Sequence, residues 1–175
     1  MLQGVSVGVG IINGRTQADP RRTATRHEAK YPSVMIRNTV LVERPIEEVF
    51  DYAAQFDRHP EWQDDLKGAT FNGPAAVGVT GTETRQMGPR VHTYEWRVSS
   101  YERPRILGFE TLSGPMRPAG TIRFAAEGTG TRVDFEMALN PRGFMKLMNP
   151  IIERQVQKTN TVHLAKFKDI LEHPN

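Results

Sequence analysis

Three side chains of the sequence have the chemistry to move or stabilise protons inside an apolar pocket: His163, His92 and Tyr94. An imidazole titrates near neutral pH and serves as a general acid or base. A phenol can donate a hydrogen bond to an oxyanion that develops during a reaction. His163 lies in a helical pattern, whereas His92 and Tyr94 are two residues apart in a strand pattern. These three are the candidate catalytic residues.

Each of the three also has a purely structural interpretation. His163 could be a hydrogen-bonded histidine of the core. His92 could lie at the end of a strand and reach solvent, and Tyr94 could pack in the core without touching a ligand. The sequence leaves both interpretations open.

Other kinds of catalytic or cofactor site are not supported by the sequence. The chain has no cysteine, which excludes disulfides, thiolate metal ligands and a sulfur nucleophile. The five histidines do not have the spacing of a helical zinc site, and no glycine pattern of the dinucleotide-binding type follows a predicted strand. We therefore expect no metal and no cofactor.

The candidate residues must be positioned by a sheet of short strands. Runs with alternating or β-branched residues are separated by Gly, Pro and Asn turns, and short connections make neighbouring strands antiparallel. The pattern predicts a curved antiparallel meander with strands at Val34–Val42, Leu66–Phe71, Val77–Gln86, Val91–Tyr101, Ile106–Leu112, Gly120–Ala126 and Thr131–Leu139.

Strand alternation predicts which side chains line the inner face of this sheet. In the last strand the apolar residues share one face and the charged residues share the other. The same test turns His92 and Tyr94 inward, together with the candidate ligand-binding residues Trp96, Phe109, Thr111, Phe124, Phe135 and Met137. The run Val77–Gln86 is ambiguous, because a bulge near Gly81 would decide between an inward pair Thr82 and Thr84 and an inward pair Glu83 and Arg85.

A long helix is predicted to close the chain, from Asn149 to about Leu171. Asn149 is placed as its cap and Pro150 as its first residue, after a short helical piece around Phe144 to Met148. Its apolar positions form one broad face, to which Val162 and Ala165 belong. Four further candidate ligand-binding residues lie on this face: Met148, Ile152, Gln155 and Thr159.

A shorter helix and a tryptophan follow the first strand. Pro45 suits a first helical position, and Glu47 and Glu48 then stabilise the first turn through the helix dipole. Pro60 ends this helical region, and Trp62 follows it. We expect Trp62 to cover the edge of the core rather than to contact a ligand.

Composition indicates one domain and a separate tail. Residues 1–32 carry five basic and two acidic side chains, whereas the remainder carries 18 of each. Because the predicted domain, residues 33–173, has no excess of positive charge, nucleic-acid binding is not expected. Residues 1–32 contain few large apolar groups and are expected to be a disordered tail. Neither a membrane anchor nor a signal peptide is expected, and the absence of cysteine fits a cytoplasmic protein.

The stretch from Arg44 to Trp62 resembles the opening of the START-like polyketide cyclase/dehydrase family, in the SRPBCC superfamily. The resemblance extends over residues 34–172, through Tyr94-Glu95-Trp96-Arg97-Val98 and Gly128-Thr129-Gly130-Thr131-Arg132-Val133. It implies an α+β helix-grip fold, in which a curved antiparallel sheet wraps around the long C-terminal helix, with two short helices after the first strand. Family cyclases commonly use a pocket arginine. The nearest candidates here are Arg85, Arg97 and Arg123, whose strand parity matches that of Glu83, Glu95 or the solvent face.

Two functions from different classes follow. The preferred hypothesis is the binding or transfer of a hydrophobic small molecule, lipid-like or polyketide-like, between the sheet and the C-terminal helix. The alternative is a polyketide cyclase, aromatase or dehydratase that uses acid–base residues in the same cavity. A third hypothesis is a protein-interaction module. The sequence does not indicate the oligomeric state.

Overall fold

The computed structural model describes residues 34–114, 117–140 and 148–174. They belong to one compact unit, Tyr31–Asn175. The tail predicted for residues 1–32 lies outside the described residues, as does the short helical piece expected around Phe144 to Met148, apart from Met148 itself. The domain bounds 33–173 stay a prediction.

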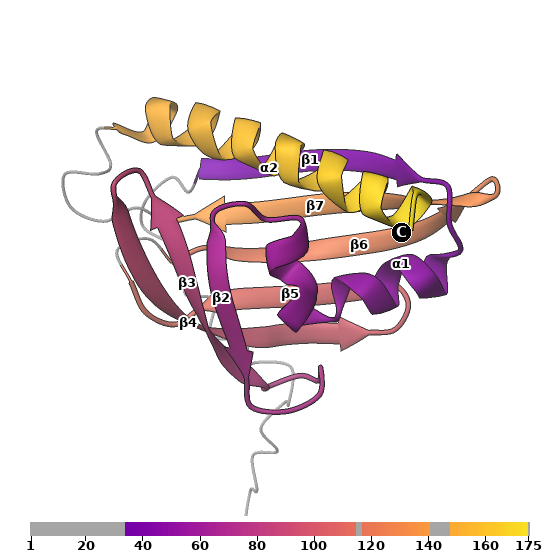
Figure 1. Cartoon of the computed structure of the whole chain (residues 1–175), viewed down its shortest axis with the longest axis horizontal. Coiled ribbons are helices and arrows are strands. Elements are labelled where there is room, and N and C mark those ends of the chain that lie inside the picture. Colours follow the sequence, from indigo (N-terminus) through magenta and orange to yellow (C-terminus); the bar gives the residue numbers. More distant parts are fainter. Residues whose placement is uncertain (1–33, 115–116, 141–147, 175) are drawn as a thin grey trace, which may run out of the picture. The chain divides into compact units, whose positions relative to one another are not determined.

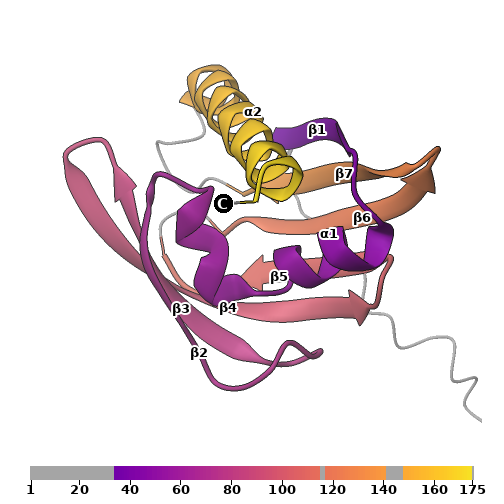
Figure 2. The same cartoon turned by 45° about the vertical axis from the view of Figure 1, so that its right-hand side comes forward.

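The described chain forms a curved seven-stranded antiparallel sheet with a long C-terminal helix, as predicted (Figure 1). Strands β2 to β7 lie side by side in chain order. Strand β1 pairs with β7, so β1 forms one edge of the sheet and β2 forms the other. In chain order the elements are β1 (Val34–Val42), α1 (Ile46–Ala53), the 3-10 helix η2 (Phe56–Glu61), β2 (Leu66–Phe71), β3 (Thr80–Met87), β4 (Arg90–Glu102), β5 (Ile106–Thr111), β6 (Ala119–Glu127), β7 (Gly130–Leu139) and α2 (Asn149–Glu172). Figures 1 and 2 show α1 and α2 on the same, concave side of the sheet.

The ambiguous strand turns its charged pair inward. Glu83 pairs with Tyr94 and Arg85 with His92 in a β3–β4 register that has no shift, so Glu83 and Arg85 share the inner face with Tyr94 and His92. No bulge interrupts β3 at Gly81. A Cβ atom at Gly81 would lie 2.6 Å from the Trp96 ring, so the glycine makes room for this indole. The register shifts lie instead between Leu66 and Gly68 in β2 and between Val98 and Ser100 in β4.

The N-caps of both helices differ by one residue from the prediction. Met148 is the N-cap of α2 and makes no side-chain capping hydrogen bond, so the prediction that Asn149 is the cap was wrong. Asn149 is instead the first helical residue, and Pro150 lies in the first turn, where its missing N–H costs no helical hydrogen bond. Pro45 is the N-cap of α1 rather than its first helical residue, and Glu47 and Glu48 occupy the first turn as predicted.

α2 packs along β1, at the edge of the sheet. Side chains of the helix hydrogen-bond to backbone groups at that edge: Gln157 Nε2 donates to Arg37 O at 2.8 Å, and Lys168 Nζ donates to Leu41 O at 2.7 Å. The Glu43 amide donates to Glu172 Oε1 at 2.7 Å. The helix is therefore held by polar contacts to the strand backbone as well as by apolar packing.

Two apolar clusters fill the concave side. The first, which we call the aromatic core, holds the buried aromatic rings of Phe50, Tyr52, Phe56, Trp62, Trp96, Phe124 and Phe167. The second, which we call the β1–β7 cluster, contains Val34, Ile36, Met137 and Leu139, with Phe109, Phe135, Ile152 and Val156 packed against it. Trp62 is buried in the aromatic core between His59 and Phe167, which agrees with its predicted structural role.

The buried face of α2 is narrower than predicted. Its buried residues are His163, Leu164 and Phe167, whereas Val162 and Ala165 are exposed. Ala165 lies on the solvent side. Val162 instead faces a cavity, described next.

Candidate functional site

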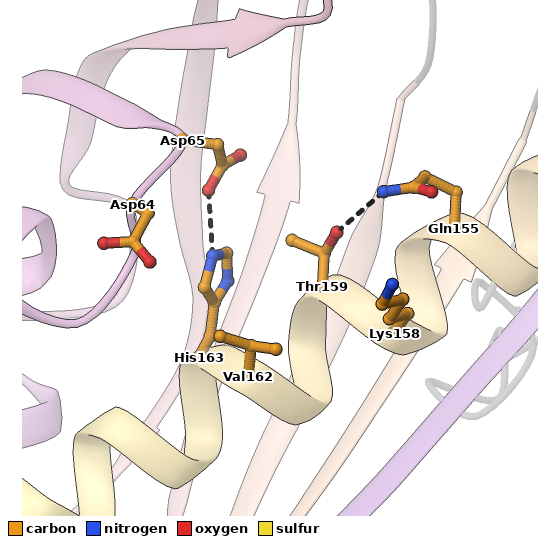
Figure 3. Close-up of a pocket in the computed structure, with 7 residues that line it drawn as sticks. All are labelled: Asp64, Asp65, Gln155, Lys158, Thr159, Val162 and His163. Carbon is orange, nitrogen blue, oxygen red and sulfur yellow. Dashed lines mark hydrogen bonds and ion pairs between the residues drawn. The ribbon is translucent and has the colours of Figure 1, made fainter.

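A cavity of about 220 Å³ lies between α2 and the connection from η2 to β2 (Figure 3). From α2 it is lined by Gln155, Lys158, Thr159, Val162 and His163, and from the connection by Asp64 and Asp65. The structure thus brings together three residues that the sequence analysis selected separately: Gln155, Thr159 and His163.

The three helix residues are together because of helical spacing. Gln155, Thr159 and His163 follow one another at intervals of four, so their side chains lie on one stripe of α2. Gln155 Nε2 donates to Thr159 Oγ1 at 3.4 Å. The stripe gives the cavity a polar wall beside the apolar side chain of Val162.

His163 meets a carboxylate at the end of this stripe. Its Nε2 atom lies 3.2 Å from Asp65 Oδ1, and its side chain is buried. Figure 3 shows the other ring nitrogen turned away from Asp65, toward the side of Thr159. Asp65 Oδ1 is itself buried, and its contact with His163 Nε2 is a close polar approach rather than a hydrogen bond of good geometry. The pair has the arrangement in which a carboxylate orients an imidazole.

Asp65 is held in its ionised form. Burial raises the pKa of Asp65, but the contact with His163 and the positive charge of Arg85 outweigh it and lower the pKa to about 2. The carboxylate is therefore charged at every physiological pH.

Arg85 connects Asp65 to the inner face of the sheet. Its Nε donates to Glu83 Oε2 at 2.8 Å, one terminal nitrogen donates to Asp65 Oδ2 at 3.1 Å, and the other donates to Gln63 Oε1 at 2.7 Å. Burial lowers the pKa of Arg85, but the charges of Glu83 and Asp65 more than compensate and raise it overall. The guanidinium is thus held in place by three hydrogen bonds and supports Asp65 from behind the cavity wall.

The other two candidate pocket arginines lie on the outer face. Arg97 pairs with Glu110 and Arg123 with Glu136, and about half of each arginine side chain is exposed. Of the three candidates, Arg85 is the one on the inner face, which is one of the two arrangements that the sequence left open for this strand.

The remaining candidate catalytic residues lie away from this cavity wall. Tyr94 is buried, and its hydroxyl donates to Met87 Sδ at 2.9 Å. Burial raises the pKa of Tyr94. His92 is half-buried beside Tyr94, with ring centroids 6.3 Å apart. Neither residue lines the cavity that His163 lines, and the catalytic roles of all three stay predictions.

The candidate ligand-binding residues divide among several environments. Trp96 and Phe124 belong to the aromatic core. Phe109, Phe135, Met137 and Ile152 belong to the β1–β7 cluster, Thr111 is half-buried at the end of β5, and Met148 is exposed at the start of α2. Gln155 and Thr159 line the cavity. Ligand contact by any of them stays a prediction.

Sequence reasoning missed Asp64 and Asp65. Both lie in the connection between η2 and β2, directly after Trp62 and Gln63, and belong to no motif. Their one sequence signal is the pair of adjacent carboxylates beside a tryptophan. No group of three or more metal-ligating side chains is present in residues 34–114, 117–140 and 148–174. No helix in these ranges is long and apolar enough to cross a membrane.

Comparison with known proteins identifies the family. Residues 33–172 match the family described as polyketide cyclase/dehydrase and lipid transport. The chain belongs to this family. The search of curated proteins gave no match.

Solved structures share the fold at low sequence identity. TTHA0849 from Thermus thermophilus is 15% identical, with a TM-score of 0.70, over 78% of this chain and 96% of that one. A START superfamily protein from Mycobacterium smegmatis is 12% identical, with a TM-score of 0.66, over 79% and 97% of the two chains. The Zhui aromatase/cyclase from Streptomyces sp. R1128 is 12% identical, with a TM-score of 0.64, over 79% and 96%. These likenesses establish the START-like fold and leave the activity open.

Proposed function

We propose that this protein binds a hydrophobic small molecule, lipid-like or polyketide-like, in the cavity between α2 and the connection from η2 to β2, on the concave side of the sheet. The observation that carries the proposal is the cavity of about 220 Å³ bounded by one stripe of α2 and the Asp64–Asp65 connection. Small-molecule sites combine an apolar surround with a few placed polar groups. Val162, Gln155 and His163 supply both kinds of surface here.

Exposed apolar side chains on the same helix support the proposal. Met148 is 43% exposed, Ile151 66% and Val162 46%. At helical spacing they fall on the side of α2 that carries Gln155. Large apolar groups that remain exposed beside a cavity are expected where a ligand covers them.

Cavity filling tests the proposal. In Val162→Trp the indole should occupy the cavity and weaken binding of a neutral fluorescent probe, N-phenyl-1-naphthylamine, by roughly tenfold or more, the equivalent of about 1.4 kcal/mol. Ala165→Trp is the matched control, because Ala165 lies on the solvent side of α2. Native mass spectrometry of freshly purified protein would detect a retained compound. Equal probe affinity in both variants would contradict this site.

A second candidate function is acid–base catalysis of the cyclase or dehydratase type. It is favoured by the 3.2 Å approach of His163 to Asp65, since a carboxylate can orient an imidazole for proton transfer. It predicts that His163→Ala abolishes turnover of an aromatic polyketide surrogate while stability changes by no more than about 1–2 kcal/mol. His92→Ala tests the other imidazole in the same assay. Unchanged turnover in both variants would remove this candidate.

We also propose that the protein acts in the cytoplasm without nucleic acid. The chain has no cysteine, and its charge excess resides in residues 1–32, outside the described fold. Cell fractionation of the tagged full-length chain tests the location. A gel-shift assay at 50–150 mM salt would test for nucleic-acid binding, which is sensitive to salt in this range.

A further inference from the structure

The polar wall of the cavity offers one hydrogen-bond acceptor that is incompletely satisfied. Asp65 Oδ1 is buried, and His163 Nε2 approaches it at 3.2 Å without good hydrogen-bond geometry, so this oxygen can accept a further hydrogen bond. His163 approaches this oxygen through Nε2, which leaves the second ring nitrogen facing the side of Thr159 (Figure 3). A buried acceptor without a donor is unfavourable unless a water or ligand supplies the hydrogen.

Several donors near this wall are already engaged. The guanidinium of Arg85 donates to Glu83, Asp65 and Gln63. Lys166 donates to Asp64, and Gln155 donates to Thr159. A molecule that enters the cavity therefore meets acceptors on the Asp65 side and few donors that could serve an anion.

The charge of the wall also disfavours an anion. Glu83 and Asp65 share the single guanidinium of Arg85, so these three partly buried side chains together carry one net negative charge. Lys158 lines the cavity as well, but it is exposed, and water and salt screen its charge. A carboxylate placed next to Asp65 would be repelled.

We propose that the molecule bound here is uncharged and presents a hydroxyl group, as a phenol or an alcohol does, which donates its hydrogen to Asp65 Oδ1 or to His163, and that carboxylates are rejected. This inference rests on the proposed binding function and specifies its ligand class. The cavity of about 220 Å³ is smaller than the ~300–1,000 Å³ of drug-sized sites, so a bicyclic ring system suits it better than a long acyl chain.

Four compounds with one ring skeleton test the inference by calorimetry at pH 7. They are 2-naphthol, which is neutral and donates; 2-methoxynaphthalene, which cannot donate; 2-naphthoate, which is anionic; and 2-methylnaphthalene, which is apolar. The wild-type protein should bind 2-naphthol about ten- to hundredfold more tightly than the methoxy compound and the naphthoate, as expected for a hydrogen bond to a charged acceptor. The 2-methylnaphthalene should still bind, because it reports the fit of the ring system to the cavity without any hydrogen bond.

Variants connect the selectivity to its residues. In Asp65→Asn the ratio of naphthol to naphthoate affinity should fall below about threefold, because the side chain loses its charge and gains a donor. Lys158→Met is the control and should leave the preference for naphthol intact. Since Asp65→Asn also loosens Arg85, circular dichroism must show that it is folded. If it is not, the four wild-type affinities decide the question.

The outcomes separate this inference from the proposed function. If the naphthoate or the methoxy compound binds as tightly as 2-naphthol or more tightly, the proposed hydroxyl preference is wrong. Binding of 2-methylnaphthalene in that case would still support the cavity as a binding site. Failure of all four compounds to bind would overturn both.

Discussion

The two halves of α2 stand in different surroundings although they form one continuous helix. In the C-terminal half Phe167 is 2% exposed, and its ring packs 5.5 Å from that of Tyr52 and 5.2 Å from that of Trp62. In the N-terminal half Ile152 and Val156 are only partly buried against the β1–β7 cluster, and Ile151 is exposed. One half of the helix is thus a structural anchor, and the other is one wall of a cavity.

His163 marks the change between the two halves. Its ring lies beside Trp62 on the core side, with centroids 6.5 Å apart, and it lines the cavity on the other side. Asp65, in the connection before β2, contacts His163 here, and Arg85 of β3 in turn holds Asp65. Because the core contacts of α2 lie mainly in its C-terminal half, side chains that line the cavity can be substituted without loss of the fold.

The largest expected effect concerns the anchored half. Phe167→Ala should lower the free energy of unfolding by about 3–5 kcal/mol, because it removes a buried ring from the aromatic core. Ile151→Ala in the other half should change it by less than about 0.5 kcal/mol. Urea unfolding followed by circular dichroism measures both. Similar losses in the two variants would erase the proposed difference between the halves.

A smaller effect is expected at the junction. Arg85→Met should cost about 3 kcal/mol of unfolding free energy, because it leaves Glu83 and Asp65 without their shared cation in a mostly buried place. Arg97→Met, which removes an exposed pair with Glu110 on the outer face, should cost only about 0–1 kcal/mol. The same unfolding assay applies. Equal costs would mean that the inner ionic cluster is no more important than a surface ion pair.

The smallest effect is the acid dependence of stability that Asp65 contributes. Its pKa is about 2 in the folded chain against an ordinary value of 3.8, so its contribution is complete above about pH 4 and is lost as the pH falls toward 2. The loss should be about 2 kcal/mol at most. The free energy of unfolding, measured at several pH values between 5 and 2, should therefore depend less steeply on pH in Asp65→Asn than in the wild type. Asp169→Asn, at an exposed position, is the control, and an unchanged slope in Asp65→Asn would contradict the assignment.

The sequence predicted the fold well where its pattern was amphipathic. In β7 the alternation of apolar and charged residues indicated the inner face directly, and Val133, Met137 and Leu139 are buried as expected. In β3 every residue from Thr82 to Arg85 is polar, so alternation carried no signal. The inward direction of Arg85 is fixed by pairing with β4.

The site was less predictable for two physical reasons. Apolar residues that face a ligand cavity have the same helical spacing as those that face the core, so Val162 and Phe167 were assigned to one face although their surroundings differ. Asp65 lies in a connection between secondary-structure elements. Its partner Arg85 is about 20 residues away in the sequence and its partner His163 about 100, so no local motif marks Asp65.

The hydrogen bonds from α2 to the backbone of β1 have a consequence for self-association. An uncovered edge strand offers unpaired amide and carbonyl groups to the strand of another molecule. Gln157 and Lys168 engage the carbonyls of Arg37 and Leu41, so β1 is blocked as a template for a further strand. At the opposite edge the register shift at Gly68 in β2 and the neighbouring charge of Lys67 work against pairing in another way. The helix that walls the cavity thus also protects the molecule from aggregation through its first strand.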